Sequence, residues 1–149
     1  MNLSLEARAY HFLNIATVSN HERLKAMHKE HGSWEAAWAS LRKQCAMNEA
    51  KELRTFNASG CRLLLSSDTD FPPLLCEIPW APHGLYIKGA LPDQKPKVAI
   101  VGTRRVTPQG KAIAKRFAEA LARRGITIVS GLALGVDGAA HEGALAAGG

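Results

Sequence analysis

The last third of the chain contains two short apolar runs, each followed by glycine and polar residues. The runs span residues 98–101 and 126–129, and β-branched residues fill nearly all of their positions. Runs without alternation of apolar and polar residues are typical of strands covered on both faces in a parallel sheet. The pattern therefore predicts two buried parallel strands.

The segment between the two runs predicts a helix. Thr107 suits its N-cap, and Pro108 suits the first helical position, where the missing N–H is not needed. The predicted buried face is marked by apolar residues four apart, namely Ile113, Phe117 and Leu121. Two arginines and then Gly125 supply the cations and the glycine that favour a helix C-terminus.

A second helix, rich in alanine and opened by Asp137, follows the second run. The order strand, helix, strand, helix at this spacing is that of a Rossmann-like unit. Two strands alone would leave much apolar surface exposed. We therefore expect the chain to be part of a longer protein in which the sheet continues.

Both predicted strands end in residues suited to an anion. Open α/β sheets bind ligands at the carboxyl ends of their strands, where glycines let a ligand reach backbone N–H groups. Hydroxyl and guanidinium groups add donors for phosphate oxygens. The candidate residues are Gly102, Thr103, Arg104 and Arg105 in the first turn and Ser130, Gly131 and Gly135 in the second. We expect an anion site between the two turns.

Residues 1–61 show helical patterns only. Amphipathic spacing predicts a first helix over residues 4–15, and a capping box at residues 19–22 opens a second. Ser33 and Asn48 suit the N-caps of two more helices. Four short helices predict a small helical domain.

Trp34 and Trp38 lie on one face of the third of these helices. If exposed, they would form a platform for nucleic-acid bases. Large aromatic residues are usually buried, however, so we expect both to pack in the core.

Residues 62–96 show a mixed pattern that prolines interrupt. Short strands are predicted at residues 63–65 and 85–87, a single helical turn at residues 74–78, and a linker at residues 91–96.

The positive charge is concentrated on the Rossmann-like part. The net charge of +6 arises entirely in residues 95–149, which carry nine Lys and Arg against three Asp and Glu, whereas residues 1–94 carry ten of each. This distribution favours an anionic partner for the second part. Lys111, Lys115 and Arg116 are explained equally well as solvated residues of a helix face.

Three widely spaced cysteines lack a C-x-x-C pair and a histidine at zinc-finger spacing. They predict reduced thiols in a cytoplasmic protein. Neither a metal nor a nucleotide cofactor is predicted, since the sequence also lacks G-x-G-x-x-G and Walker A motifs. Charged residues interrupt the N-terminal apolar residues, which argues against a signal peptide and a membrane span.

Two sequence motifs in residues 98–145, taken together, resemble the pattern of one known family. They are VAIVGTRRVTPQG at residues 98–110 and SGLALGVDGAAHEGAL at residues 130–145, preceded by DFPPLL and GLYIKG. The combination resembles the DNA-processing protein A family, also called DprA or Smf, over residues 62–149. The resemblance implies a protein without established enzymatic chemistry that binds and protects incoming single-stranded DNA. It also implies loading of the RecA recombinase onto that DNA during natural transformation.

The resemblance assigns roles to individual residues. The first motif, with Gly102, Thr103 and Arg104, lines the basic DNA pocket in the family, and Arg104 is the expected phosphate contact. The second motif contains the remaining matches, namely Ser130, Gly131, Gly135, Asp137 and His141.

The sequence departs from the family pattern in two places. Leu134 stands where many members carry arginine, which leaves one cation fewer near the pocket. Residues 16–19 lack the glycines of the N-terminal hairpin that many members show. The family's usual homodimer surface would lie beyond residue 149.

Several residues have a second interpretation. Arg104 would pair with Asp137 if the two turns lie close together. Asp137 and His141 lie on one helix face and form either an acid–base pair or, as we favour, an N-cap and a hydrogen-bonded structural residue.

A nucleotide-binding or nucleotide-hydrolysing protein of a related Rossmann-like fold is the competing function class. The same glycine turns would suit a mononucleotide. A steep salt dependence of binding distinguishes a nucleic-acid strand from a mononucleotide, for which the dependence is shallow.

The sequence thus predicts an α/β protein with two parts. A small helical (SAM-like) domain spans residues 1–61, and an incomplete Rossmann-like parallel-sheet domain spans residues 62–149. The predicted function is binding of single-stranded DNA through its phosphates without sequence preference, with RecA as a partner and no membrane association.

Overall fold

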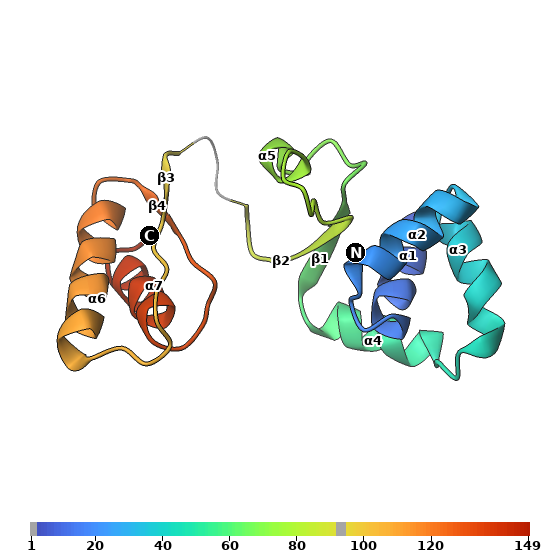
Figure 1. The fold of residues 1–149 in the computed structure, drawn as a ribbon, viewed down its shortest axis with the longest axis horizontal. Helices are drawn as coiled ribbons and strands as arrows, with labels where there is room; N and C mark the ends of the chain where they lie inside the picture. Colours follow the sequence, from blue (N-terminus) through green and yellow to red (C-terminus); the bar gives the residue numbers. More distant parts are fainter. Residues whose placement is uncertain (1–2, 92–94) are drawn as a thin grey trace. The chain divides into compact units, whose positions relative to one another are not determined.

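The structure, a computed structural model, describes residues 3–91 and 95–149 of an α/β protein (Figure 1). It divides into two compact units, Met1–Ala90 and Leu91–Gly149. The sequence placed a domain boundary after residue 61 instead. Part of the linker predicted at residues 91–96 lies outside the described residues.

Four α-helices and one 3-10 turn open the first unit. They are α1 (Leu5–Ala16), α2 (His21–His31), α3 (Trp34–Leu41), η1 (Arg42–Gln44) and α4 (Glu49–Ala58). Ser33 and Asn48 are N-caps as predicted, and each side chain accepts a backbone N–H three residues ahead at 3.1 and 3.0 Å. The capping box prediction for Ser19 was wrong. Asn20 caps α2 instead, because Ser19 has a φ of 56° and belongs to the preceding turn.

Two strands and a helical turn complete the first unit. They are β1 (Cys61–Leu65), α5 (Pro73–Cys76) and β2 (Gly84–Lys88). β1 and β2 pair antiparallel, with Leu63 opposite Tyr86. Leu63 and Leu65 join the core of the helices, which is why the compact unit extends to Ala90 rather than ending at residue 61.

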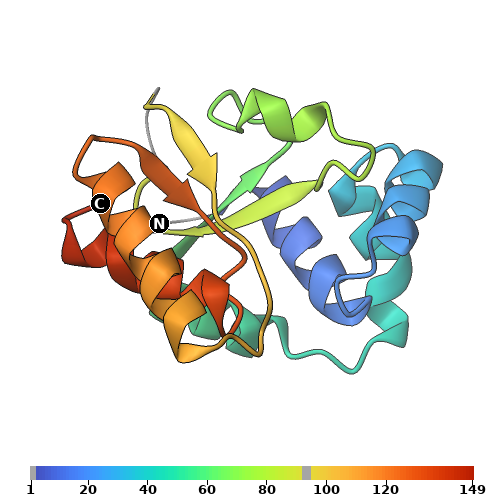
Figure 2. The ribbon, with the colours of Figure 1, turned by 60° about the vertical axis from the view of Figure 1, so that its left-hand side comes forward.

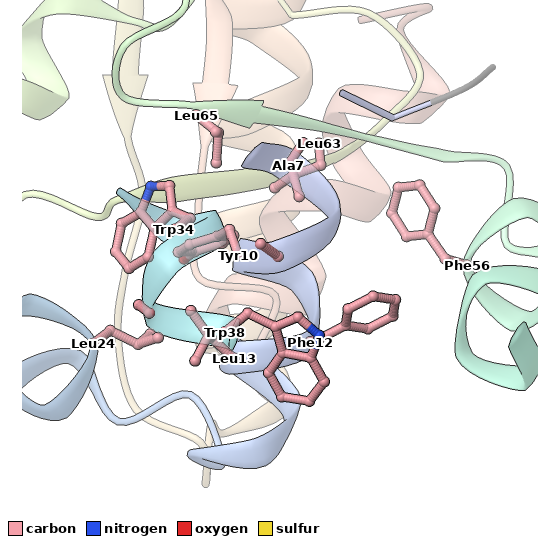
Figure 3. Close-up of a cluster of buried hydrophobic side chains, with 12 residues drawn as sticks. Ala7, Tyr10, Phe12, Leu13, Leu24, Trp34, Trp38, Phe56, Leu63 and Leu65 are labelled. Carbon is pink, nitrogen blue, oxygen red and sulfur yellow. The ribbon is translucent and has the colours of Figure 1, made fainter. Parts of the chain in front are cut away.

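Large aromatic and aliphatic side chains fill the core of the first unit (Figure 3). Trp34 and Trp38 are 4% and 6% exposed, so the prediction that they pack in the core is confirmed. The rings of Tyr10 and Trp34 meet edge to face with centroids 4.9 Å apart, a favourable arrangement for aromatic pairs. Leu13 is fully buried at the centre.

The second unit has the predicted order of strand, helix, strand and helix. Its elements are β3 (Lys97–Ala99), α6 (Pro108–Ala122), β4 (Thr127–Val129) and α7 (Val136–Ala146). β3 and β4 pair in parallel, with Val98 opposite Ile128, and α6 and α7 lie side by side (Figure 2). Thr107 caps α6 as predicted, accepting the N–H of Gly110 at 3.1 Å.

The buried face of α6 differs from the predicted one. Ile113 and Phe117 are 66% and 60% exposed, whereas the buried residues of this helix are Ala114, Ala118 and Ala122. These alanines face α7, which approaches so closely that a Cβ on Gly143 would lie 2.9 Å from the carbonyl carbon of Lys115. Only small residues allow two helices to pack at this distance.

The two parallel strands are also more exposed than predicted. Val101, just after β3, is 69% exposed, and Val129 is 47% exposed. The expectation of strands covered on both faces is therefore wrong for the residues that the structure describes. Each of the two strands has only the other as its described partner.

Candidate functional site

The ends of β3 and β4 bring the two predicted turns together. Because the strands run parallel, both carboxyl ends reach the same edge of the sheet. The N–H of Ile100 donates to the carbonyl of Val129 at 3.0 Å, and this bond continues the pairing up to the turns. The turn that begins at Gly102 and the turn that begins at Ser130 therefore lie next to each other.

The Asp137 carboxylate bridges the two turns. Its Oδ1 accepts the N–H of Gly102 at 3.1 Å, and its Oδ2 accepts the N–H of Gly131 at 3.1 Å. The residue is 5% exposed. Two backbone amides that the sequence offered to a ligand are thus bound by a side chain of the protein itself.

The prediction that Asp137 is the N-cap of α7 was wrong, and the alternative pair with Arg104 does not form among the described residues. The N-cap of α7 is Gly135, and Asp137 is the second residue of the helix. Among the ion pairs of the described residues, none joins Asp137 to an arginine. A carboxylate that is held in this way links the two turns.

The hydroxyl groups of the turns also bond within the protein. The Ser130 hydroxyl donates to the carbonyl of Ile100 at 2.6 Å. The Thr103 hydroxyl accepts the N–H of Arg105 at 3.1 Å. Both hydroxyls therefore hold the local backbone.

Gly135 allows the second turn to press against the first. Its φ is +88°, and a Cβ there would lie 2.8 Å from the carbonyl oxygen of Arg104 and still nearer to that of Thr103. The N–H of the next residue, Val136, donates to the Thr103 carbonyl at 3.2 Å. This position needs glycine both for its left-handed backbone and for the close approach.

A basic pocket of about 390 Å³ opens beside the turns. Its lining includes Arg104, Arg105, Lys111, Leu134, Gly135 and Glu142. Both arginines are exposed, and the described residues form no ion pair with either of them. Their guanidinium groups are open to an anion in solvent.

Lys111 lines this pocket, whereas the sequence left open whether it is a solvated residue of a helix face. It lies in the first turn of α6, and helical side chains lean toward the helix N-terminus, which brings it back toward the arginines. Its Nζ lies 3.2 Å from Oε1 of Glu142, and Lys115 lies 3.7 Å from the other carboxylate oxygen. Its place near the N-cap Thr107 was the signal that would have identified it.

The structure thus separates the predicted site residues into two groups. Arg104, Arg105 and Gly135 line the pocket. The others, Gly102, Thr103, Ser130 and Gly131, form the turns behind it.

His141 lies one turn after Asp137 on α7 and is partly buried. Its Nε2 atom is buried without a hydrogen-bond partner in the part of the chain that the structure describes. Within residues 3–91 and 95–149, no three His, Cys, Asp or Glu side chains group as a metal site. No helix in these ranges is both long and apolar enough to cross a membrane.

Comparison with known proteins identifies a family. A sequence model of the family described as DNA recombination-mediator protein A matches residues 62–149, more than half of the chain. A protein named Smf from Synechocystis sp. is 38% identical over 104 residues, which cover 66% of this chain and 26% of that protein. The DNA processing protein DprA of Streptococcus pneumoniae is 45% identical over 83 residues, which cover 55% of this chain and 29% of that protein.

A solved structure is similar over nearly the whole chain. The X-ray structure of DNA processing protein A from Streptococcus pneumoniae superimposes with a TM-score of 0.60 and 27% identity. The match covers 99% of this chain and 51% of that one. The chain therefore spans about half of the solved relative and about a quarter of the curated ones.

Proposed function

Because this chain belongs to the DNA recombination-mediator protein A family, we propose that it acts in DNA processing by binding single-stranded DNA. The observation that carries the proposal is the basic pocket, in which Arg104 and Arg105 are exposed next to Lys111. The names of the relatives, which refer to DNA processing, support the same class of function.

The chemistry of the pocket suits a phosphate backbone. Guanidinium groups bind phosphate oxygens through paired, charge-assisted N–H bonds. The whole net charge of +6 lies in residues 95–149, and such a charge attracts a polyanion independently of its sequence. We therefore assign binding through phosphates, without preference for particular bases.

The proposed role is binding and delivery rather than catalysis. Asp137, the one carboxylate between the turns, has both oxygens held by backbone amides. Protection of incoming DNA, loading of RecA and a homodimer of the whole protein follow from the family resemblance, and a cytoplasmic location follows from the reduced, widely spaced cysteines. These belong to the proposal.

The binding proposal is tested by fluorescence anisotropy of the 149-residue chain with labelled oligo-dT over a series of salt concentrations. Arg104→Ala should weaken binding about tenfold, the usual effect of losing one hydrogen-bonded charge contact. The slope of log affinity against log salt should fall by about 0.7, the value for one phosphate contact on a single strand.

Arg123→Ala is the matched control for this variant. It removes the same unit charge at the far end of α6, where Arg123 pairs with Glu119. The helix of 15 residues is about 22 Å long, so this charge lies well away from the pocket. Equal losses of affinity for oligo-dT in the two variants would refute a binding site at Arg104. Salt-insensitive binding of a mononucleotide would favour the nucleotide-binding alternative.

The RecA part needs its own measurement. Addition of the wild-type chain should accelerate assembly of RecA on oligo-dT, and Arg104→Ala should remove most of this acceleration. If the wild-type chain binds DNA but leaves RecA assembly unchanged, loading is not a function of these residues.

A further inference from the structure

The position of Asp137 is unusual for an acidic side chain. The carboxyl ends of parallel strands are where open α/β folds bind anionic ligands, and backbone N–H groups at such turns attract negative charge. Asp137 is 5% exposed and lies at this place, between the turns after β3 and β4. Its carboxylate accepts one N–H from each turn.

The Asp137 carboxylate accepts the hydrogen bonds of the two turns and also occupies the space between them. A Cβ built on Gly131 would lie 2.9 Å from Oδ2 of Asp137, so the oxygen packs directly against the glycine backbone. A Cβ on Gly102 would lie 2.8 Å from a methyl group of Val136. A phosphate aimed at these two amides would therefore meet a buried negative charge.

We propose that Asp137 is a specificity-determining residue that occupies the anion position between the two turns and closes it to the phosphate of a mononucleotide. The anion-binding groups that remain are the side chains of Arg104 and Arg105 in the pocket outside. These two side chains can contact a phosphate at the protein surface, where the backbone of a nucleic-acid strand would present it. This last step rests on the proposed function, whereas the closure of the amides does not.

The same bonds fix the turn that carries the arginines. Asp137 holds the amide of Gly102, two residues before Arg104, and Val136 holds the carbonyl of Thr103. The residue thus has two effects on one site, since it blocks the inner anion position and orients the outer cations.

The test is a titration of ¹⁵N-labelled chain with inorganic phosphate and with thymidine monophosphate, followed through the backbone amide signals of Gly102 and Gly131. Asp137→Asn removes the charge and replaces one acceptor oxygen by an NH₂ group, which cannot accept an N–H. We expect these two signals to respond to phosphate at a concentration at least tenfold lower in the variant than in the wild type.

Glu142→Gln is the matched control. It removes one negative charge from the same helix and the same pocket, but it contacts Lys111 and Lys115 rather than the glycine amides. Its Gly102 and Gly131 signals should behave as in the wild type. A response equal to that of Asp137→Asn would show that general charge, not the occupied position, governs anion access.

Two results would overturn the proposal. One is a saturable response of the wild-type glycine amides at the concentration that suffices for the variant. Another is a folded Asp137→Asn protein whose two amides ignore phosphate. If Asp137→Asn does not fold, Asp137→Ser is titrated in its place beside the wild type. Strong shifts of the wild-type Gly102 and Gly131 signals then refute the closure of the anion position.

Anisotropy with oligo-dT on the same samples separates this inference from the DNA proposal. Closed amides together with absent DNA binding would refute the proposed function and leave the role of Asp137 intact. DNA binding together with a phosphate response of the wild-type amides would refute the role of Asp137 and leave the proposed function intact.

Discussion

The two units bury different kinds of side chain. The first unit packs large residues such as Leu13, Trp34 and Trp38 around its centre. In the second unit, the buried apolar residues among those described are all alanines, namely Ala114, Ala118, Ala122, Ala139, Ala140 and Ala144. The large apolar residues Ile113 and Phe117 are exposed there.

This difference shows two ways of holding a unit together. Burial of a large side chain contributes about 1.5–3 kcal/mol, and an alanine methyl contributes about 0.8 kcal/mol. The first unit therefore rests on its core. The second depends on the close contact of α6 and α7 and on the bonds between its turns, and it leaves large apolar side chains on the surface.

Leu13→Ala should have the largest effect, because Leu13 is fully buried. Truncation of a leucine in a core costs about 2–5 kcal/mol in the free energy of unfolding. All three tryptophans of the chain lie in the first unit, so urea unfolding followed by tryptophan fluorescence reports on that unit alone.

Leu145→Ala is the control for the same truncation. Leu145 is 72% exposed on α7, and exposed substitutions change stability by less than about 0.5 kcal/mol. Far-UV circular dichroism during urea unfolding measures this variant. A loss comparable to that of Leu13→Ala would mean that the second unit has a core of large side chains after all.

Ala118→Leu should have the next largest effect. Ala118 is 0% exposed in the contact of α6 with α7, and overpacking of such a contact costs about 1–3 kcal/mol. Its neighbour Phe117 is 60% exposed, and Phe117→Ala should cost far less. Amide hydrogen exchange of α6 measures both. The reverse order would restore the helix face that the sequence predicted.

The sequence determines the ends of the helices better than their faces. Ser33, Asn48 and Thr107 were recognised as N-caps because capping depends on neighbouring residues. The face of α6 was misjudged because two sets of residues four apart run side by side, one beginning at Ile113 and the other at Ala114. Only the close approach of α7 selects the alanines.

The candidate site shows the same limit. Its location at the two strand ends, and its exposed arginines, follow from local pattern and the rules of parallel sheets. The role of Asp137 does not, because its partner Gly102 lies 35 residues away and meets it only once β3 and β4 have paired. The sequence therefore favoured an N-cap role for Asp137, with a pair to Arg104 as the less favoured alternative, and gave no sign of the two glycine amides.

The smallest expected effect concerns histidine in the first unit. His83 lies against Trp34 and stacks on His21, with ring centroids 5.2 and 5.1 Å apart. Burial lowers the pKa of His83, and the positive charges of His21, His28 and Lys25 lower this pKa further. The folded unit therefore resists protonation of this ring more than the unfolded chain does.

The sign of the pH dependence follows from this pKa. In the unfolded chain His83 takes up a proton near pH 6.5, whereas in the folded unit it does so only at lower pH. Its contribution to stability is present above pH 6.5 and is lost as the pH falls through the folded pKa. The urea midpoint of tryptophan fluorescence should drop less between pH 7 and pH 5 in His83→Gln than in the wild type. His21→Gln, which removes only one of the neighbouring charges, should give an intermediate drop of the urea midpoint. Equal drops in all three proteins would show that the His83 ring does not couple folding to pH.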